Sequence, residues 1–299
     1  MQTFSDFTSR ALVPEQLEHY VRAVSTCTPL RMGPFLAWRN ASSLILAGFP
    51  CDSGLPTFAE GSPVQEPART RLLQDLDQTL QEAQSLPWVE TITLLAPVRP
   101  GAVPGNATCH EDAYFGLDLP LGRLGGKLGN MLRRGRTLTE ITVNDTWSRE
   151  HEALVAQAVR VLGNRPGEQR LLPEHARLFA RLGHYVTANP GKVCCYSARR
   201  RDNGSLCGLV LGDHASYTTS FYLFAFRSPD APPGTADVLL HSLCQHSVEL
   251  GQVRCNLGLG IHGGIRFFKA KWGASLWMPC HECSWSVKKR GFLARLLSR

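Results

Sequence analysis

Apolar positions in the first part of the chain predict a strand, a helix and a second strand. Residues 42–49 (SSLILAGF) form a short apolar run that is typical of a strand. After a loop rich in Pro and Gly, four apolar residues recur at helical spacing behind Pro67: Leu72, Leu76, Leu80 and Ala83. Residues 88–97 (WVETITLLAP) then alternate as a strand with β-branched residues. This order is typical of an α/β unit.

The same order returns in the second half of the chain. Residues 205–212 (SLCGLVLG) predict a strand, and residues 252–260 (QVRCNLGLG) predict the next one. Between them a Pro-rich loop leads to a helix over about residues 236–250, which Gly251 ends. The offset between the halves is nearly constant, at 162 residues from Leu44 to Leu206 and 164 from Val89 to Val253. We therefore expect two copies of one unit.

The segment between the two copies predicts a basic helix over residues 121–134, a turn at Gly135 and a strand over 137–143. A further helix is expected over 148–162, and the boundary between the copies falls close to Asn144. The expected fold is α/β (α+β), with two tandem domains that each hold a mixed sheet flanked by helices. The predicted domains are residues 1–143 and 144–299.

Composition and charge indicate a soluble protein with a basic surface. The chain is 43% hydrophobic and 19% charged, it has no apolar run long enough to span a bilayer, and its first residues lack the layout of a secretory signal. We expect a cytoplasmic protein. The formal charge of +7 is concentrated in residues 127–136, 199–201 and 288–299. These clusters fit either a phosphate-bearing partner or an ordinary solvated surface.

The ten cysteines are scattered and lack the density of a disulfide-rich scaffold, so we expect them to be reduced. The spacing of Cys280 and Cys283 (CHEC) is the one that suits a metal. A structural zinc site needs a second ligand pair, and the sequence has no matching C-x-x-C. We predict no metal site, and a structural or incidental role for these two residues.

Three stretches of the chain resemble the Fem-type aminoacyltransferases, a family of tandem GNAT fold that builds peptidoglycan cross-bridges. Residues 113–141 (AYFGLDLPLGRLGGKLGNMLRRGRTLTEI) resemble the family's strand and basic helix. Residues 204–226 (GSLCGLVLGDHASYTTSFYLFAF) resemble its strand pair around a turn. Residues 253–274 (VRCNLGLGIHGGIRFFKAKWGA) resemble the signature with an FK pair that closes its second domain. The resemblance covers most of the chain from about residue 110 onward.

The resemblance implies a transferase that forms an amide by direct attack of an amine on an activated acyl or aminoacyl ester. It implies aminoacyl-tRNA as donor, an amine-bearing acceptor and no tightly bound cofactor. Two departures leave alternatives open. Asn256 stands where the family has an acidic residue. The loop that would hold acyl-CoA pyrophosphate is replaced by residues 226–239 (FRSPDAPPGTADVL), whose prolines remove amides that such a loop needs.

One alternative is therefore an acyl-CoA-dependent GNAT N-acyltransferase with a divergent pyrophosphate loop. The other is a non-catalytic module of the same fold that binds RNA or nucleotides. Neither a Ser-His-Asp nor a Cys-His arrangement is visible at a recognisable spacing, so no covalent nucleophile is predicted.

The resemblance places Lys269, with Phe268 beside it, close to the reacting ester. Arg266 lies three residues earlier on the same face of the predicted helix, while Phe268 and Trp272 are expected to pack inward. Lys269 would offset developing negative charge or bind a phosphate; otherwise it is a surface lysine. His262, before two glycines, is the histidine that we expect to act in catalysis.

Substrate-binding roles are expected for residues in four places. Asp213 and His214 follow a strand at a predicted turn, where local hydrogen bonding is the simpler explanation. His241 and His246 are expected to be packing residues. The remaining predicted substrate-binding residues are Arg266 and Lys271 on the last helix, Tyr217 and Tyr222 on the central hairpin, and Arg133 and Arg134 for phosphates of tRNA.

Overall fold

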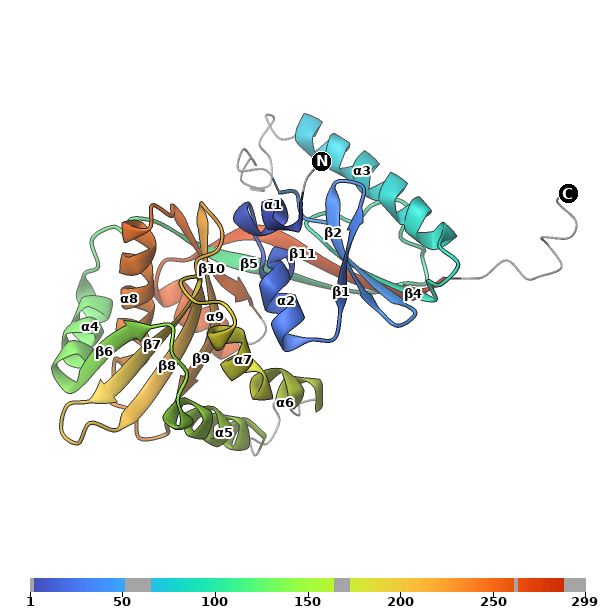
Figure 1. Cartoon of the computed structure of the whole chain (residues 1–299). Coiled ribbons are helices and arrows are strands. Elements are labelled where there is room, and N and C mark those ends of the chain that lie inside the picture. The colour runs from blue at the N-terminus through green and yellow to red at the C-terminus, as the bar shows by residue number, and fades with distance from the viewer. Residues whose placement is uncertain (1–2, 52–65, 164–172, 261–262, 288–299) are drawn as a thin grey trace, which may run out of the picture. The chain divides into compact units, whose positions relative to one another are not determined.

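The computed structural model describes residues 3–51, 66–163, 173–260 and 263–287, and it is an α/β fold of mixed sheet and helices (Figure 1). The chain divides into two compact units. Unit 1 comprises Met1–Ser25 and Tyr114–Leu276, and unit 2 comprises Thr26–Ala113 and Trp277–Arg299. The boundary predicted after residue 143 lies inside unit 1. Among the described residues, no helix combines the length and apolar character needed to cross a membrane.

Unit 2 is built on a strand meander followed by a helical crossover. Strands β1, β2 and β3 are antiparallel neighbours, and helix α3 leads from β3 to β4, which pairs parallel to β3. Strand β11 pairs antiparallel to β4 at the edge of β4 that faces away from β3. The bounds are β1 (Thr28–Met32), β2 (Phe35–Asn40), β3 (Ser43–Ala47), α3 (Glu66–Ser85), β4 (Thr91–Ala96), β5 (Thr108–Asp118) and β11 (Ser275–Ser286). Strands β5 and β11 contribute residues to both units.

The core of unit 2 confirms the helical stripe expected from the sequence. The four residues of that stripe in α3 are buried against the sheet: Leu72, Leu76, Leu80 and Ala83. The intervening positions of α3 are exposed or half-buried except for Thr79, which is consistent with the 3.6-residue period of a one-sided helix.

Cys109 and Cys283 form a disulfide within unit 2, and the expectation that all cysteines are reduced was therefore wrong. The two residues are 174 positions apart in sequence, and their α-carbons lie 4.1 Å apart on β5 and β11. Strand pairing brings them together, which the spacing of cysteines along the chain does not reveal. Because the Cys283 sulfur is bonded to another sulfur, the CHEC spacing does not supply two free thiols.

Unit 1 has strand order β5-β10-β9-β8-β7-β6. Its first helices are α1 (Phe4–Ser9), the 3-10 turn η1 (Pro14–Gln16) and α2 (Glu18–Val24). The central elements are α4 (Gly126–Leu138), β6 (Thr139–Asn144), α5 (Arg149–Gly163), α6 (Pro173–Ala180) and α7 (Leu182–Thr187). The last are β7 (Val193–Arg200), β8 (Leu206–Asp213), β9 (Thr219–Arg227), α8 (Thr235–Glu249), β10 (Arg254–Leu259) and α9 (Gly263–Lys271).

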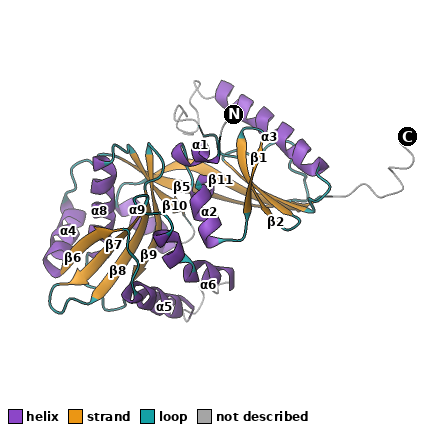
Figure 2. Cartoon of the chain, viewed as in Figure 1, coloured by secondary structure: helices purple, strands orange, loops and turns teal. Residues whose placement is uncertain are grey.

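The helices of unit 1 cover the two faces of its sheet (Figure 2). Helices α4, α8 and α9 pack on one face, and α2, α5, α6 and α7 pack on the other. Strand β7 shows the alternation that this requires. Cys194 and Tyr196 belong to the cluster beneath α8, whereas Val193 and Cys195 belong to the cluster beneath α5 and α7.

Both units contain three antiparallel strands, a helix and a strand parallel to the third. In this order of elements, β3 of unit 2 corresponds to β9 of unit 1. The sequence pattern instead matched β3 to β8. The existence of two copies of one ancestral unit stays a prediction. The expected turn at Gly135 was also wrong, because Gly135 lies within α4 and is buried against the start of α8.

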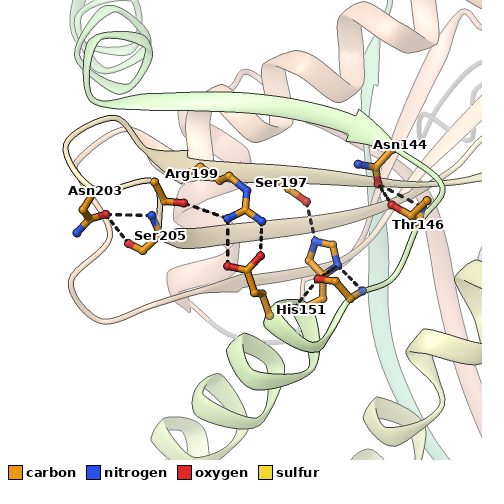
Figure 3. A network of polar contacts seen from close by, with 10 residues as sticks. Asn144, Thr146, His151, Ser197, Arg199, Asn203 and Ser205 are labelled. Carbon is orange, nitrogen blue, oxygen red and sulfur yellow. Dashed lines mark hydrogen bonds and ion pairs between the residues drawn. The ribbon is translucent and has the colours of Figure 1, made fainter.

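A polar network fixes the connection from β6 to α5 (Figure 3). His151 is buried, accepts a hydrogen bond at Nδ1 from the Ser148 backbone amide at 3.1 Å, and therefore donates from Nε2 to Ser197 at 2.9 Å. Burial lowers the pKa of His151. Close by, Arg199 pairs with Glu150 through both terminal guanidinium nitrogens, Nη1 and Nη2. The neutral imidazole thus joins α5 to strand β7.

Candidate functional site

Strands β9 and β10 are parallel but stay paired only at their beginnings. Pairing runs from Thr219 with Arg254 to Phe221 with Asn256, and in the described residues it extends no further, although β9 continues to Arg227. The Asn256 side chain fixes the backbone where the pairing of the two strands ends. Its Nδ2 donates to the Leu12 carbonyl at 2.8 Å, and its Oδ1 accepts from the Gly258 amide at 2.7 Å. An ionised carboxylate cannot donate, so an amide suits this position where the family has an acid.

Lys269 reaches the end of β10 from helix α9. Its ammonium donates to the carbonyl oxygens of Gly258 at 2.7 Å and Leu259 at 2.6 Å, and lies 5.0 Å from the centre of the Phe115 ring. The residue is 3% exposed, so it is not a surface lysine. Arg266, expected on the same helix face, is exposed. His262 lies outside the described residues.

Helix α9 docks on α8 through a carboxylate. The Asp237 carboxylate accepts a hydrogen bond from Trp272 Nε1 at 3.0 Å. It also forms an ion pair with the Lys271 ammonium at 2.5 Å. The Phe268 ring stacks on Tyr222 with 6.5 Å between centroids, and the Lys271 ammonium lies 5.0 Å from the Phe268 centroid. Phe268 and Trp272 pack inward as expected. Within this cluster Lys271 already has a carboxylate partner.

The start of helix α8 is covered by helix α4. A β-carbon on Gly234, the N-cap of α8, would come within 2.3 Å of the Met131 carbonyl oxygen. A β-carbon on Gly135 would come within 2.8 Å of the Gly234 carbonyl oxygen. The two glycines allow the backbones to touch. The first turn of α8 also carries the buried Asp237. The α4 backbone therefore lies against the start of α8 at Gly234, and the first turn of α8 carries a carboxylate.

A cavity of about 510 Å³, here called the α4 cavity, lies at the glycine-rich entry to helix α4. It is lined by Arg133, Arg136 and His241 together with residues of the preceding loop and first turns: Leu121, Gly122, Leu124, Gly125, Gly126, Gly129, Asn130 and Leu132. Burial and the nearby Arg136 lower the pKa of His241. Arg133 faces this cavity, whereas its exposed neighbour Arg134 does not line it. Two arginines give this cavity positive charge. Four of its lining residues are glycines, which have no side chains to cover the backbone.

A second cavity, of about 660 Å³ and here called the β7 cavity, lies between β6, β7 and α8. Its polar lining includes Cys194 and His246 with two carboxylates, Asp145 and Glu249. Burial, followed by the Asp145 and Asp213 carboxylates, raises the pKa of Cys194 to about 11. The thiol is thus protonated near neutral pH.

His214 and His246 are joined through Tyr196. The Gln252 amide nitrogen donates to backbone carbonyls, with the shortest contact to Ser216 at 2.7 Å, so its Oε1 accepts from His214 Nδ1 at 2.8 Å. The Tyr196 hydroxyl then donates to His214 Nε2 and accepts from His246 Nδ1, each at 2.7 Å. Burial lowers the pKa of His214, which keeps this ring neutral. Sequence reasoning assigned His246 to packing and missed this chain.

Asp213 and His214 are adjacent in sequence but serve opposite sides of the sheet. Asp213 is fully buried, where it accepts from the Tyr185 hydroxyl and pairs with His19 at 2.5 Å. His214 contacts Tyr196 beneath α8. Tyr217 is 74% exposed. The structure therefore does not gather the predicted substrate-binding residues into one place.

Comparisons with known proteins identify the fold. The C-terminal domain of a protein assigned as a lysylphosphatidylglycerol synthetase from Agrobacterium fabrum aligns with a TM-score of 0.55 at 16% identity, covering 98% of this chain and 93% of that domain. A conserved protein of unknown function from Bacteroides thetaiotaomicron aligns with a TM-score of 0.59 at 15% identity, covering 94% and 95%. FemX aligns with a TM-score of 0.54 at 10% identity, covering 100% and 99%.

No protein-family model matches the chain, and no curated protein sequence matches it. At these identities the structural matches define the fold alone. They confirm the expected resemblance to Fem-type proteins at that level, over nearly the whole length of each chain.

Proposed function

We propose that the chain transfers an acyl or aminoacyl group from an activated ester to an amine. The observation that carries this proposal is the parting of β9 and β10 beside the buried Lys269, in a chain that shares the FemX fold over 99% of FemX. Direct attack fits the contacts of Lys269, since its ammonium lies against two backbone carbonyls and an aromatic ring, none of which is a nucleophile.

Lys269 would act through its charge rather than as a base. Its ammonium is held by the Gly258 and Leu259 carbonyls, so its position is fixed before substrate binds. A preorganised cation of this kind stabilises negative charge that develops on an ester carbonyl oxygen, an effect worth about 3 kcal/mol in other enzymes. Phe268 and Lys271 then serve to position α9, through Tyr222 and Asp237.

The structure favours aminoacyl-tRNA over acyl-CoA as the donor. In the CoA-dependent alternative, diphosphate would bind open amides at the start of the helix that follows β9. Here that start is occupied by α4 and carries Asp237. The α4 cavity supplies cations instead, from Arg133 and Arg136, and fits a phosphate of a nucleic acid.

The acceptor is proposed by analogy. One of the matched proteins is named for a product in which a lysyl group is joined to phosphatidylglycerol. The acceptor screen therefore includes the hydroxyl groups of phosphatidylglycerol in addition to amines.

The test is a donor and acceptor screen followed by two matched variants. Purified protein is incubated with aminoacyl-tRNA or acyl-CoA, with amine acceptors or phosphatidylglycerol vesicles, and products are detected by mass. We expect transfer from aminoacyl-tRNA. Arg133→Ala should raise KM for tRNA about tenfold, whereas Arg134→Ala, at the exposed neighbour, should change it little.

Failure of transfer with every donor would overturn the proposal. If the protein binds RNA with a steep dependence on salt but turns over no donor, the non-catalytic alternative replaces it. Transfer from acyl-CoA alone would restore the CoA-dependent alternative.

A further inference from the structure

Three side chains from separate elements of unit 1 bring metal-ligating atoms together. Cys194 lies on β7, His214 follows β8, and His246 lies on α8. One ligand atom of each, a sulfur or an imidazole nitrogen, lies within 4.8 Å of the other two. The proposed transfer uses none of them.

The two imidazoles direct nitrogens at a single point. That point is the Tyr196 hydroxyl, 2.7 Å from His214 Nε2 and 2.7 Å from His246 Nδ1. The register of β7 with β8 places Cys194 opposite Gly212. A β-carbon on Gly212 would come within 2.8 Å of the Tyr196 ring, so the glycine makes room for this arrangement.

The partner of His214 is of the kind that orients a metal ligand. Gln252 accepts from His214 Nδ1 at 2.8 Å and is itself fixed by backbone carbonyls. This leaves the Nε2 lone pair of His214 for the centre of the cluster. Metal-bound histidines in proteins characteristically have such a second hydrogen bond, which sets the tautomer and the ring orientation.

The β7 cavity provides access and room for a further ligand. Cys194 and His246 both line it, and its volume of about 660 Å³ exceeds that of a water molecule many times. Asp145 and Glu249 line the same cavity and make its interior attractive to cations.

We propose that Cys194 Sγ, His214 Nε2 and His246 Nδ1 bind Zn²⁺, with water from the β7 cavity as the fourth ligand. One thiolate and two imidazoles suit zinc, while Mg²⁺ and Ca²⁺ prefer oxygen ligands. Binding releases the Cys194 thiol proton to solvent and displaces the Tyr196 hydroxyl from between the rings. The His246 proton moves from Nδ1 to Nε2 by exchange with solvent, so that the Nδ1 lone pair binds the metal. The ligand atoms must draw in from the present limit of 4.8 Å to separations of about 3.3–3.8 Å, as tetrahedral coordination of zinc requires.

The site does not depend on the transferase proposal, because its test measures metal and not turnover. The full chain is freed of metal with a chelator, loaded with Co²⁺ or Zn²⁺ and dialysed. Metal content is measured by mass spectrometry, and Co²⁺ reports a thiolate ligand through charge-transfer absorption. Cys194→Ser and His246→Gln remove ligands. Cys195→Ser is the matched control, since Cys195 is the next residue on β7 and faces the opposite side of the sheet.

We expect one zinc ion per chain, a thiolate band with Co²⁺, and affinity at least about 100-fold weaker in Cys194→Ser and His246→Gln than in Cys195→Ser. Gln252→Ala, which removes only the partner of His214, should weaken binding about 10–100-fold. Circular dichroism confirms that each variant is folded; if Cys194→Ser is not, the half-buried His246→Gln decides. No retained metal in folded protein, no thiolate band, or equal binding by the ligand and control variants overturns the proposal.

Discussion

A β-carbon on Gly234 would come within 2.3 Å of the carbonyl oxygen of Met131, so helices α4 and α8 touch backbone to backbone at the start of α8. Gly234 also has a φ of +90°, which other residues adopt with strain. This contact lies at the start of the helix where a CoA diphosphate would bind in the alternative proposal, and the proposed preference for another donor depends on it.

Gly234→Ala should destabilise the protein more than strain alone explains. Gly251 is the matched control, because its φ is +78° and a β-carbon there meets nothing within 4 Å. Gly251→Ala should cost about 1–2 kcal/mol from backbone strain. Gly234→Ala should cost about 1–3 kcal/mol more, because α4 must move away. Urea unfolding measures both, and equal losses would contradict close packing of α4 on α8.

Lys269→Met should lower the free energy of unfolding by about 2–4 kcal/mol, because two buried carbonyls lose a charged donor. Arg266→Met, on the same helix but exposed, should stay within about 0.5 kcal/mol of the unmodified protein. Thermal unfolding compares the two. If Lys269→Met is as stable as Arg266→Met, the ammonium does not hold the end of β10.

Stability should fall as the pH drops below about 6.5, the ordinary pKa of histidine. Burial lowers the pKa of His151 in the folded state, so below 6.5 this residue binds more protons in the unfolded chain than in the folded one. Stability from this residue is complete above 6.5 and is lost toward its folded pKa, by at most about 1.4 kcal/mol per pH unit.

Urea unfolding between pH 7.5 and about 5 measures this loss, in a window above the ordinary range of carboxyl groups. The variant His151→Gln keeps a donor for Ser197 and should show a shallower decline than the unmodified chain. A free energy of unfolding that rises as the pH falls through this window would contradict the assignment of a neutral buried His151.

The disulfide predicts the result of counting thiols. Alkylation of the unfolded chain without reductant should modify eight cysteines, and alkylation after reduction should modify ten. Because the bond closes a separation of 174 residues, its reduction should lower stability by an amount on the order of 4–5 kcal/mol, the upper end of the usual range. Ten modified cysteines without reduction would show that Cys109 and Cys283 are not bonded.

Local patterns in the sequence predicted the helices and much of the sheet. The stripe of α3 from Leu72 to Ala83 and the packing of Phe268 and Trp272 follow from periodicity, which needs only neighbouring residues. The prediction of a turn at Gly135 was wrong because tertiary packing explains the glycine. That glycine is required by the approach of α8 and not by a chain reversal.

The candidate sites depend on long-range pairing that one sequence does not reveal. Cys194 and His246 are brought together by the packing of α8 on β7, and nothing in the pattern of α8 distinguishes His246 from a packing residue. The sequence leaves Lys269 either as a site residue or as a surface lysine of an amphipathic helix. It is buried because the carbonyls of Gly258 and Leu259 meet it at the end of β10.

The most direct test of the account is a single-turnover measurement with both donors under the same conditions. An excess of protein is mixed with labelled aminoacyl-tRNA or labelled acyl-CoA and an amine acceptor, and the label on donor and product is followed in time. We expect loss of label from aminoacyl-tRNA with matching appearance in product, a slower reaction in a folded Lys269→Met variant, and no transfer from acyl-CoA. Transfer from acyl-CoA with none from aminoacyl-tRNA would contradict it.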